Sequence, residues 1–497
     1  MPGVEERGSP AGFTVVAWAR FALPKLLCGL LTFSAHAELP QTVAQALRQA
    51  GIPESSVAIE VDDLDAARPL LQHGSERSLN PASLMKLVTT LAVLDYFGPA
   101  HTFTTHVLLD GALKDGILDG RLILRGGGDP ALTLERFWLL LREIRARGVR
   151  EIHGEVVLDD GDYQIDPADP AAFDAAPLRP YNAQPAALLV NFNSVTLRLG
   201  RDAGAVHAAI DPPLDAPLLV NGLSPRDGPC MDVREQMRLE AGRLILDGGY
   251  AESCGDRAIA LNLLAPAATT AAWFRQLWGE QGGKLVGNVV SGATPVTARP
   301  LLAFESQPVA LLVRDTNKFS NNVMARMLFL NLGAARFGAP ATWDKGVRAV
   351  RSWLVERDLL CEPLELENGA GLSRSERITA HALSRLLRWA TRQPLWFDFA
   401  ASLPAVGQEG TQRHRLRDTA TTGRAWLKSG SLKGARNLAG YVLTANGGRR
   451  VVVFLINHER AEAGSRAQDA LLEWAAETQG APRPKAQPEN ADEKNMQ

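Results

Sequence analysis

The sequence predicts an α+β protein with a large, mostly β insertion, and three observations lead to this fold class. Helical patterns begin near positions 83 and 320, which are 237 residues apart. Strand-like runs at 424–431 and 450–457 precede a closing helical pattern at 467–475. Between the first two helices, residues 98–295 form short alternating runs separated by Gly, Asp and Pro, with helices expected only near 134–146 and 271–281.

The first helical pattern places a hydroxyl beside an amine. Ser83 and Lys86 are three positions apart, so they share one face of a helix. Asn80 and Pro81 are typical of an N-cap and first turn, and Gly98-Pro99 ends the pattern. We therefore expect Ser83 in the first turn of a buried helix, where free N–H groups favour an oxyanion.

A serine hydroxyl becomes a good nucleophile only when a base removes its proton. A lysine can be that base if burial or a neighbouring cation lowers its pKa. Lys428 is the candidate cation, so like-charge repulsion and burial are both expected to lower the pKa of Lys86.

Two later segments supply further polar groups. Ser320 and Asn322 open the second helical pattern and offer a hydroxyl and an amide two residues apart. Lys428-Ser429-Gly430 lies on a strand-like run whose small residues would let a substrate backbone pair alongside. Each feature alone is ordinary, because Lys86 could extend from an amphipathic helix, Asn322 could cap one and Lys428 could lie on an edge strand.

The order of the three motifs resembles a known group of enzymes. S-x-x-K, then S-x-N, then K-[ST]-G is the signature of the penicillin-recognising serine enzymes. The flanking residues are similar to the D-alanyl-D-alanine carboxypeptidase/endopeptidase family, the class C low-molecular-mass penicillin-binding proteins, from about residue 39 to 476. The similar segments are Asn80-Pro-Ala-Ser-Leu-Met-Lys-Leu-Val-Thr-Thr90, Arg314-Asp-Thr-Asn-Lys-Phe-Ser-Asn-Asn322, Glu367-Asn-Gly-Ala-Gly-Leu-Ser-Arg374 and Ser402-Leu-Pro404.

This resemblance implies a transpeptidase/β-lactamase-like domain, an antiparallel sheet with helices on both faces. Residues 38–97 and 297–476 would form that catalytic domain. Residues 98–296 would form an inserted accessory region of one or two lobes, because domains usually contain about 50 to 250 residues.

The resemblance also implies roles in acylation. Ser83 would attack the carbonyl between two D-alanines of a peptidoglycan stem peptide, with Lys86 as general base, and water would then hydrolyse the acyl-enzyme. The N–H groups of Ser83 and Ser431 would form the oxyanion hole. Penicillin would acylate the same serine, and neither a metal nor an organic cofactor is expected.

The remaining residues would bind the substrate. Ser320 would relay a proton to the leaving group, and Asn322 would hold the substrate amide. Lys428 and Ser429 would bind the terminal carboxylate, with Gly430 as a further substrate-binding position. Many relatives have threonine where Ser429 stands, so its hydroxyl would be held less tightly. Some members place an acidic specificity residue in the inserted region, for which Asp174 is the nearest candidate here.

Two alternatives stay open from the sequence. A β-lactamase or esterase could use the same scaffold, although no glutamate is assignable as a deacylating base. A cell-wall-binding protein with a vestigial site is the non-enzymatic alternative, although all three motifs are intact. The balance between carboxypeptidase and endopeptidase activity and the oligomeric state are left open.

Residues 1–37 have the features of a signal peptide. Arg20 and Lys25 precede a short apolar run, and Ala35-His-Ala37 fits the small-x-small cleavage rule. We expect an exported protein, most simply periplasmic, with cleavage before Glu38. Residues 480–497 are rich in Pro, Gln, Asn and charge and are predicted to be a disordered tail.

Composition narrows the function classes. At 497 residues, 46% apolar and 22% charged, the chain can build more than one core, and a net charge of −2 gives no basic surface for nucleic acid. The histidines form no H-E-x-x-H motif, and the closing helix lacks a Lys/Arg cluster, so membrane contact would be peripheral at most. Cys230 and Cys254 could pair in the inserted region or remain thiols.

Overall fold

The computed structural model describes residues 38–202, 204–214 and 218–477. The predicted signal peptide at 1–37 and the predicted tail at 480–497 lie outside the described residues. Across the described ranges, no helix is both long and apolar enough to cross a membrane.

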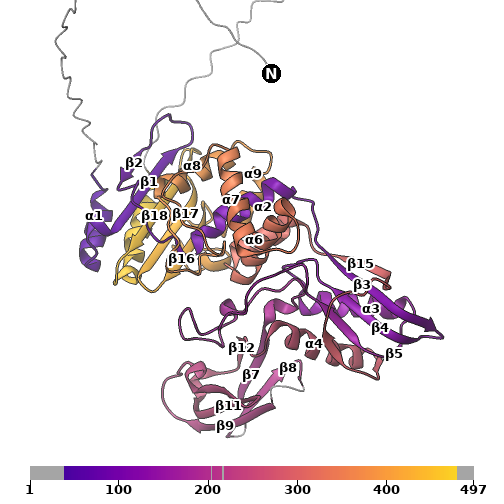
Figure 1. Cartoon of the computed structure of the whole chain (residues 1–497). Coiled ribbons are helices and arrows are strands. Elements are labelled where there is room, and N and C mark those ends of the chain that lie inside the picture. The colour runs from indigo at the N-terminus through magenta and orange to yellow at the C-terminus, as the bar shows by residue number, and fades with distance from the viewer. Residues whose placement is uncertain (1–37, 203, 215–217, 478–497) are drawn as a thin grey trace, which may run out of the picture. The chain divides into compact units, whose positions relative to one another are not determined.

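A five-stranded antiparallel sheet joins the two ends of the described chain (Figure 1). Its strand order is β16-β17-β18-β1-β2, so β1 from the N-terminal part pairs with β18 from the C-terminal part. The predicted central strand at 450–457 is confirmed as β18. The strands are β1 (Val57–Asp63), β2 (Leu71–His73), β16 (Ala425–Leu432), β17 (Ala435–Leu443) and β18 (Arg449–Asn457).

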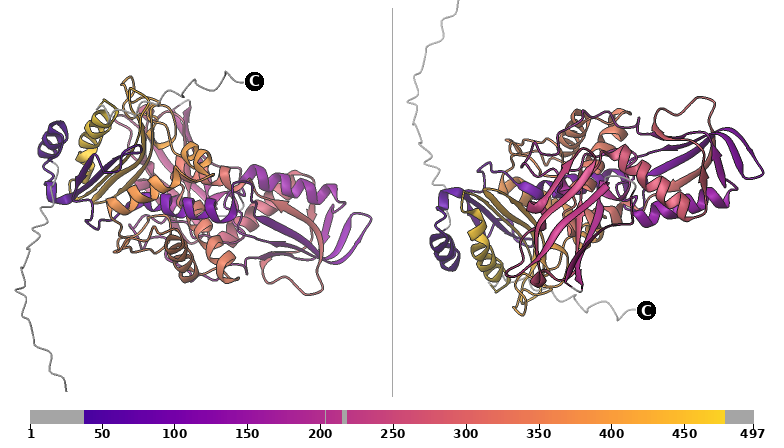
Figure 2. Two further views of the ribbon diagram at one scale, coloured as in Figure 1. Left: turned by 90° about the horizontal axis from the view of Figure 1, so that it is seen from above. Right: turned by 90° about the horizontal axis from the view of Figure 1, so that it is seen from below.

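Helices cover both faces of this sheet, as predicted (Figure 2). On one face, α1 (Gln41–Ala50) and α10 (Ser465–Glu477) pack against apolar side chains of β1, β17 and β18. On the other face lie α2 (Met85–Phe97) and α8 (Ala380–Ala390). The fold class is therefore confirmed.

Helix α2 is the centre of the helical layer. Ten of its residues are buried, and the helices around it belong to the same core cluster. Burial on nearly all sides explains its continuous apolar sequence, in contrast to the one-sided stripe of a surface helix. Helix α2 packs against α5 (Val309–Lys318), α6 (Asn322–Phe337) and α7 (Trp343–Glu356), and α9 (Trp396–Ser402) packs against α5.

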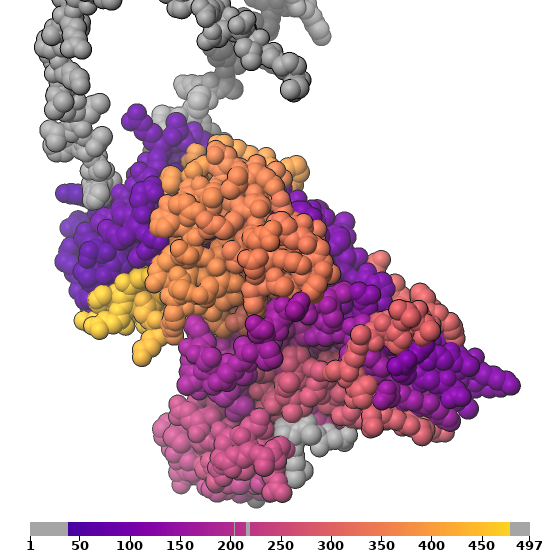
Figure 3. Space-filling model, viewed as in Figure 1, coloured from indigo at the N-terminus to yellow at the C-terminus, as the bar shows by residue number. Residues whose placement is uncertain are grey.

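The described residues of the inserted region form a seven-stranded sheet and two α-helices, besides smaller elements. Both helices were predicted, and they are α3 (Leu134–Ala146) and α4 (Pro266–Glu280). Strands β3 and β4 form a hairpin that turns at Asp115-Gly116. In the space-filling view, purple residues of this part of the chain form the narrow end of the molecule at the right (Figure 3). The strands are β3 (Thr104–Lys114), β4 (Ile117–Arg125), β5 (Glu151–His153), β6 (Val156–Asp159), β13 (Lys284–Leu285), β14 (Val289–Ser291) and β15 (Arg299–Glu305).

Strand β15 lies beyond the predicted boundary at residue 296. It pairs with β3, so the sheet of the inserted region extends to Glu305. The sequence could not place this end, because pairing of β15 depends on a strand almost 200 residues earlier.

Two three-stranded sheets complete the inserted region, with strand orders β12-β7-β8 and β10-β11-β9. A disulfide joins Cys230 and Cys254, which resolves the pairing that the sequence left open, and Cys361 is a free cysteine. The strands are β7 (Val195–Asp202), β8 (Ala205–Asp211), β9 (Leu218–Arg226), β10 (Met237–Glu240), β11 (Arg243–Ala251) and β12 (Arg257–Leu261).

Candidate active site

Ser83 lies in a 3₁₀ turn, Ala82–Leu84, and α2 begins directly afterwards at Met85. The sequence predicted the first turn of the α-helix, and the turn is instead of the tighter 3₁₀ type. Asn80 shapes it, because its Oδ1 accepts a hydrogen bond from the Ala82 N–H at 2.8 Å. Ser83 is thus presented at the N-terminal end of a buried helix.

Two asparagines that sequence reasoning missed hold this turn on the sheet. Asn437 Nδ2 and Asn457 Nδ2 both donate to the Asn80 carbonyl, at 2.9 and 3.1 Å. Asn457 Oδ1 also accepts from the Asn80 N–H at 2.7 Å. The sequence signal that could have found them is an asparagine near the start of β17 and another at the end of β18, because buried amides are normally hydrogen-bonded.

Lys86 is fully buried and has three polar partners. Its Nζ lies 3.0 Å from Ser83 Oγ, 2.6 Å from Asn322 Oδ1 and 2.5 Å from the Ala370 carbonyl. The last two can only accept hydrogen bonds from an amine. A neutral Lys86 can therefore donate both N–H groups to them and direct its lone pair at the Ser83 hydroxyl.

Burial is the main cause that lowers the pKa of Lys86 well below its ordinary value, and the positive charges of Lys428 and Arg326 lower it further. Glu376 acts in the opposite direction. The expected effect of burial and Lys428 is therefore found, and two further charged residues also act on this amine.

Ser320 and Asn322 come from the junction of α5 and α6. Ser320 has a φ of 55°, in the left-handed region, and this bend starts the new helix. Asn321 caps α6 by accepting from the Met324 N–H at 3.1 Å, and Asn322 is the first helical residue. The cap fixes the direction in which the Asn322 amide reaches Lys86.

Lys428 is fully buried on β16 and contacts the other side of this junction. Its Nζ donates to Ser320 Oγ and to the Ser429 carbonyl, each at 2.7 Å. Burial lowers the pKa of Lys428 to about 7. Two buried amines thus lie on either side of the Ser320–Asn322 segment.

Strand β16 is at one end of the strand order of the five-stranded sheet among the described residues, with β17 as its neighbour, so it is an edge strand. An isolated bridge from Ala405 to Trp426 covers one end of the outer edge. Gly430 lies against the Ser83 turn, where an added Cβ would be 2.5 Å from the Pro81 carbonyl oxygen and 3.0 Å from Ser83 N. Ser431 Oγ accepts a hydrogen bond from Arg436 at 3.2 Å.

The loop at 367–376 also belongs to the site. An added Cβ at Gly371 would lie 1.9 Å from the Ala82 carbonyl, and this glycine has a φ of 79°. Ala370 precedes it and supplies the carbonyl bound by Lys86. The sequence analysis singled out this loop only through its resemblance to the family. Its two glycines are a further signal, because glycine allows close approach of another backbone.

The three predicted motifs therefore meet in one place through contacts of Lys86, Lys428 and Gly430. Among the described residues, Asp174 is hydrogen-bonded to neighbouring residues of the inserted region and not to these motifs. Its carboxylate accepts hydrogen bonds from Tyr181 at 2.7 Å and Asn182 at 2.8 Å, both within the inserted region. A cavity of about 770 Å³ also lies in that region, and none of the motif residues lines it.

The chain is similar in sequence to two carboxypeptidases. A D-alanyl-D-alanine carboxypeptidase from Actinomadura sp. strain R39 is 27% identical over 477 residues, covering 89% of this chain and 85% of the relative. D-alanyl-D-alanine carboxypeptidase DacB from Haemophilus influenzae is 24% identical over 415 residues, covering 82% of this chain and 86% of the relative.

The fold is also similar to a solved structure. The crystal structure of penicillin-binding protein 4 (DacB) from Haemophilus influenzae matches with a TM-score of 0.74 and 22% identity, over 87% of this chain and 99% of that one. At the level of sequence families, residues 39–478 match the D-Ala-D-Ala carboxypeptidase 3 (S13) family, which takes in nearly all of the described residues, and the chain therefore belongs to that family.

Proposed function

We propose that this protein is an exported serine-type D-Ala-D-Ala carboxypeptidase and D-alanyl endopeptidase that cleaves peptidoglycan stem peptides through an acyl-enzyme. Family membership supports the carboxypeptidase class. The observation that carries the serine mechanism is the contact of Lys86 Nζ with Ser83 Oγ at 3.0 Å, while two fixed acceptors occupy the amine's other donors.

In this proposal Ser83 is the nucleophile and Lys86 the general base. The lowered pKa of Lys86 increases the fraction of neutral amine at ordinary pH, which is the form that can take the hydroxyl proton. Ser83 Oγ then bonds to the carbonyl carbon, and the C–N bond to the leaving D-alanine breaks. Water later hydrolyses the ester.

Charge on the tetrahedral intermediate would be stabilised by the N–H groups of Ser83 and Ser431. The close packing of Gly430 against the Ser83 turn supports this role, because it brings the β16 backbone beside the nucleophile. The outer edge of β16 can pair with an extended peptide in the manner of an added strand.

Substrate binding would involve the second amine. Lys428 and Ser429 would hold the terminal carboxylate, whose negative charge would favour the protonated form of Lys428 despite a pKa of about 7. Ser320, which accepts from Lys428, would pass a proton to the leaving amine, and Asn322 would hold a substrate amide.

The same residues support covalent binding of penicillin, with Ser83 opening the β-lactam ring. The related Haemophilus influenzae protein has been solved in complex with a β-lactam, and that structure matches this chain with a TM-score of 0.70. We also propose the division into a catalytic domain and an inserted region, extended to Glu305 by strand β15.

The alternative function, a β-lactamase, is less well supported. Among the described residues, no carboxylate is hydrogen-bonded to Ser83 or Lys86. Glu376, the acid that acts on Lys86, uses one oxygen for the backbone N–H groups of Glu367 and Asn368. We therefore expect slow deacylation of penicillin and a long-lived adduct.

The test is the Ser83→Ala variant of the mature protein, with Ser55→Ala on the exposed surface as the matched control. Wild type and control should gain the mass of one penicillin and should release D-alanine from defined muropeptides, and they should also cleave D-alanyl cross-bridges. Ser83→Ala should do none of these while keeping its melting temperature.

An adduct that persists in Ser83→Ala would refute the assignment of the nucleophile. Penicillin turnover faster than muropeptide turnover would favour a β-lactamase, and peptidoglycan binding without products would favour a vestigial site. D-alanine release without cross-bridge cleavage would restrict the activity to carboxypeptidase.

A further inference from the structure

The cavity of about 770 Å³ in the inserted region has no part in the proposed reaction. Its volume is within the range of about 300 to 1,000 Å³ that is usual for ligand pockets. Three segments supply most of its lining: the loop at 167–179, strand β10 with the turn before it, and residues 262–266, which lead from β12 into α4.

Two buried asparagines hold the wall of this cavity together. Asn193 Nδ2 donates to Asn262 Oδ1 at 2.8 Å and to the Leu264 carbonyl at 2.7 Å. Asn262 Nδ2 donates to the Pro177 carbonyl at 3.1 Å, and the Asn262 N–H donates to the Leu178 carbonyl at 3.0 Å. These bonds tie the loop to the segment before α4, so the cavity is a preformed feature of the fold.

Strand β10 lies along this cavity with one of its edges. It is at one end of the strand order β10-β11-β9, and among the described residues it pairs with β11. Met237, Arg238 and Leu239 all line the cavity. Successive side chains of a strand point to opposite faces, so a cavity that touches three in succession lies beside the edge of the strand. Leu239 is also 42% exposed, although it is a large apolar residue. An edge of this kind can pair with an extended peptide.

Two arginines of the cavity wall share a single carboxylate. Arg179 Nη2 lies 3.3 Å from Asp232 Oδ2, and Arg234 Nη1 lies 3.5 Å from Asp232 Oδ1. A guanidinium has five N–H donors and binds carboxylates well, so each arginine can also bind a second acid. A ligand that carries a carboxylate therefore complements this part of the wall.

Most of the remaining lining is apolar and consists of proline, alanine and leucine residues. The other charged residues of the lining are Glu235 and Arg238, and Arg238 is already paired with Glu240 and Asp247 at 3.1 and 3.3 Å. An extended peptide that alternates apolar and acidic residues suits the whole wall. Its backbone can pair with β10, its acidic side chains can reach the two arginines, and its apolar side chains can contact the rest.

We propose that this cavity binds an extended acidic segment of a partner protein, which adds to β10 as a further strand and brings a carboxylate to Arg179 and Arg234. Strand β10 has four residues, so the paired segment has a similar length. A peptidoglycan stem peptide is the alternative occupant. Its D-residues favour backbone angles of the opposite sign from those of a strand of L-residues, so it pairs less well with β10.

The test selects peptides from a random-sequence library displayed on phage, with the whole protein as the target. The selected sequences should alternate apolar residues with aspartate or glutamate. One selected peptide is then synthesised, and its dissociation constant is measured by fluorescence anisotropy. Hydrogen exchange of the β10 amides should slow when this peptide binds, because an added strand protects the amides of an edge.

Two variants alter the cavity, and each has a matched control. Ala265→Trp narrows the cavity from an exposed position of its lining, and its control is Ala267→Trp, at an exposed position of α4 that is not part of that lining. Arg179→Gln removes one cation, and its control is Arg243→Gln at the exposed start of β11. Each cavity variant should weaken binding of the peptide about tenfold or more, and the controls should not change it.

Weaker binding in both cavity variants, unchanged binding in both controls and protection of β10 would support the proposal. A selection without acidic sequences, equal binding by Ala265→Trp, or β10 amides that are not protected would overturn it. Displacement of the peptide by a muropeptide would also overturn it, since the cavity would then be a substrate site. Melting temperatures identify a variant that fails to fold, and the other cavity variant then decides. None of these measurements requires Ser83, so failure of the proposed function would leave their outcome unaffected.

Discussion

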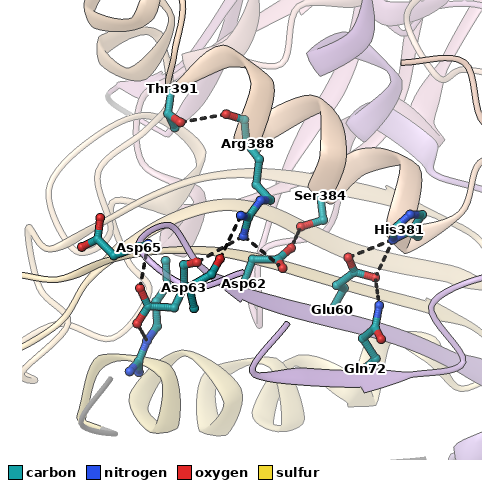
Figure 4. A network of polar contacts seen from close by, with 11 residues as sticks. Glu60, Asp62, Asp63, Asp65, Gln72, His381, Ser384, Arg388 and Thr391 are labelled. Carbon is teal, nitrogen blue, oxygen red and sulfur yellow. Dashed lines mark hydrogen bonds and ion pairs between the residues drawn. The ribbon is translucent and has the colours of Figure 1, made fainter. Parts of the chain in front are cut away.

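Two clusters of buried charge lie in the sheet-and-helix part of this protein, and they differ in how the charges are compensated. Between β1 and α8, carboxylates are matched by cations and hydroxyls (Figure 4). Around α2, β16 and α6, two amines are buried beside neutral oxygens, and the first charges that act on Lys86 are other cations. The first cluster pairs opposite charges, whereas among the described residues neither amine of the second cluster has an anionic hydrogen-bond partner.

The cluster at α8 follows from two simple periodicities. Glu60 and Asp62 alternate on β1 and therefore point to the same face of the sheet. His381, Ser384 and Arg388 are spaced along one face of α8 and meet them. His381 Nδ1 lies 3.1 Å from Glu60 Oε1, and Arg388 Nη1 lies 3.2 Å from Asp62 Oδ1.

The basic groups of the two clusters have pKa values shifted in opposite directions. At α8, the hydrogen bond to Glu60 raises the pKa of His381, which stabilises its charged form. At the site, burial lowers the pKa of both Lys86 and Lys428, which disfavours their charged forms. A buried charge that has a partner of opposite charge holds its neighbours in place. A buried amine that lacks such a partner destabilises the fold but is more reactive.

Removing the base should produce the largest effect. We expect Lys86→Met to lower the rate of acylation by penicillin about 10³-fold, because general-base catalysis contributes about 10²- to 10⁴-fold. Its melting temperature should not fall. The folded state holds Lys86 at a lowered pKa, so any gain in stability from Met should be largest at low pH and should vanish as the pH approaches 10.5.

Differential scanning calorimetry across pH, with stopped-flow acylation, measures both quantities. A clear loss of stability in Lys86→Met near neutral pH would show that the amine is favourably compensated in the fold, and the contrast between the two clusters would then be wrong.

Breaking the cluster between β1 and α8 should lower the stability of the protein and leave the rate of acylation unchanged. Arg388→Met leaves the Asp62 carboxylate, which is 3% exposed, with a hydroxyl partner only. We expect unfolding to become easier by about 3 kcal/mol, because removing one partner of a buried ion pair strands the other charge. The exposed Arg392 gives the matched control, Arg392→Met.

Urea denaturation measures the loss of unfolding free energy in Arg388→Met. The acylation rate of this variant at low temperature should stay near the wild-type value. Equal stability of Arg388→Met and Arg392→Met would indicate that Asp62 is adequately held by Ser384 alone.

The smallest expected effect is the pH dependence of His381. Its pKa is raised in the folded state, so its contribution to stability is complete below the unfolded value of 6.5 and is lost as the pH rises through the folded value. Because the ring is partly exposed, the contribution should be below about 1 kcal/mol.

His381→Gln keeps a hydrogen-bond donor but does not titrate. The stability of wild type relative to this variant should decline as the pH rises above 6.5. A constant difference over that range would show that Glu60 does not hold the histidine in its charged form.

The sequence by itself determined the local elements and the identity of the chemical groups. The helix after Ser83, the helix that opens near Asn322 and the strand that carries Lys428 were each readable from about a dozen residues, because periodicity is local. The fold class and family also followed, since the order of three motifs is a property of the chain.

Only the tertiary structure decided how these groups act on one another. Lys86 and Asn322 are 236 residues apart, and their contact depends on the packing of α2 against α6. The end of the inserted sheet at Glu305 and the disulfide of Cys230 and Cys254 depend on partners elsewhere in the chain. The influence of Arg326 and Glu376 on Lys86 could not be predicted either, because burial and electrostatic interaction depend on distance in space and not along the sequence.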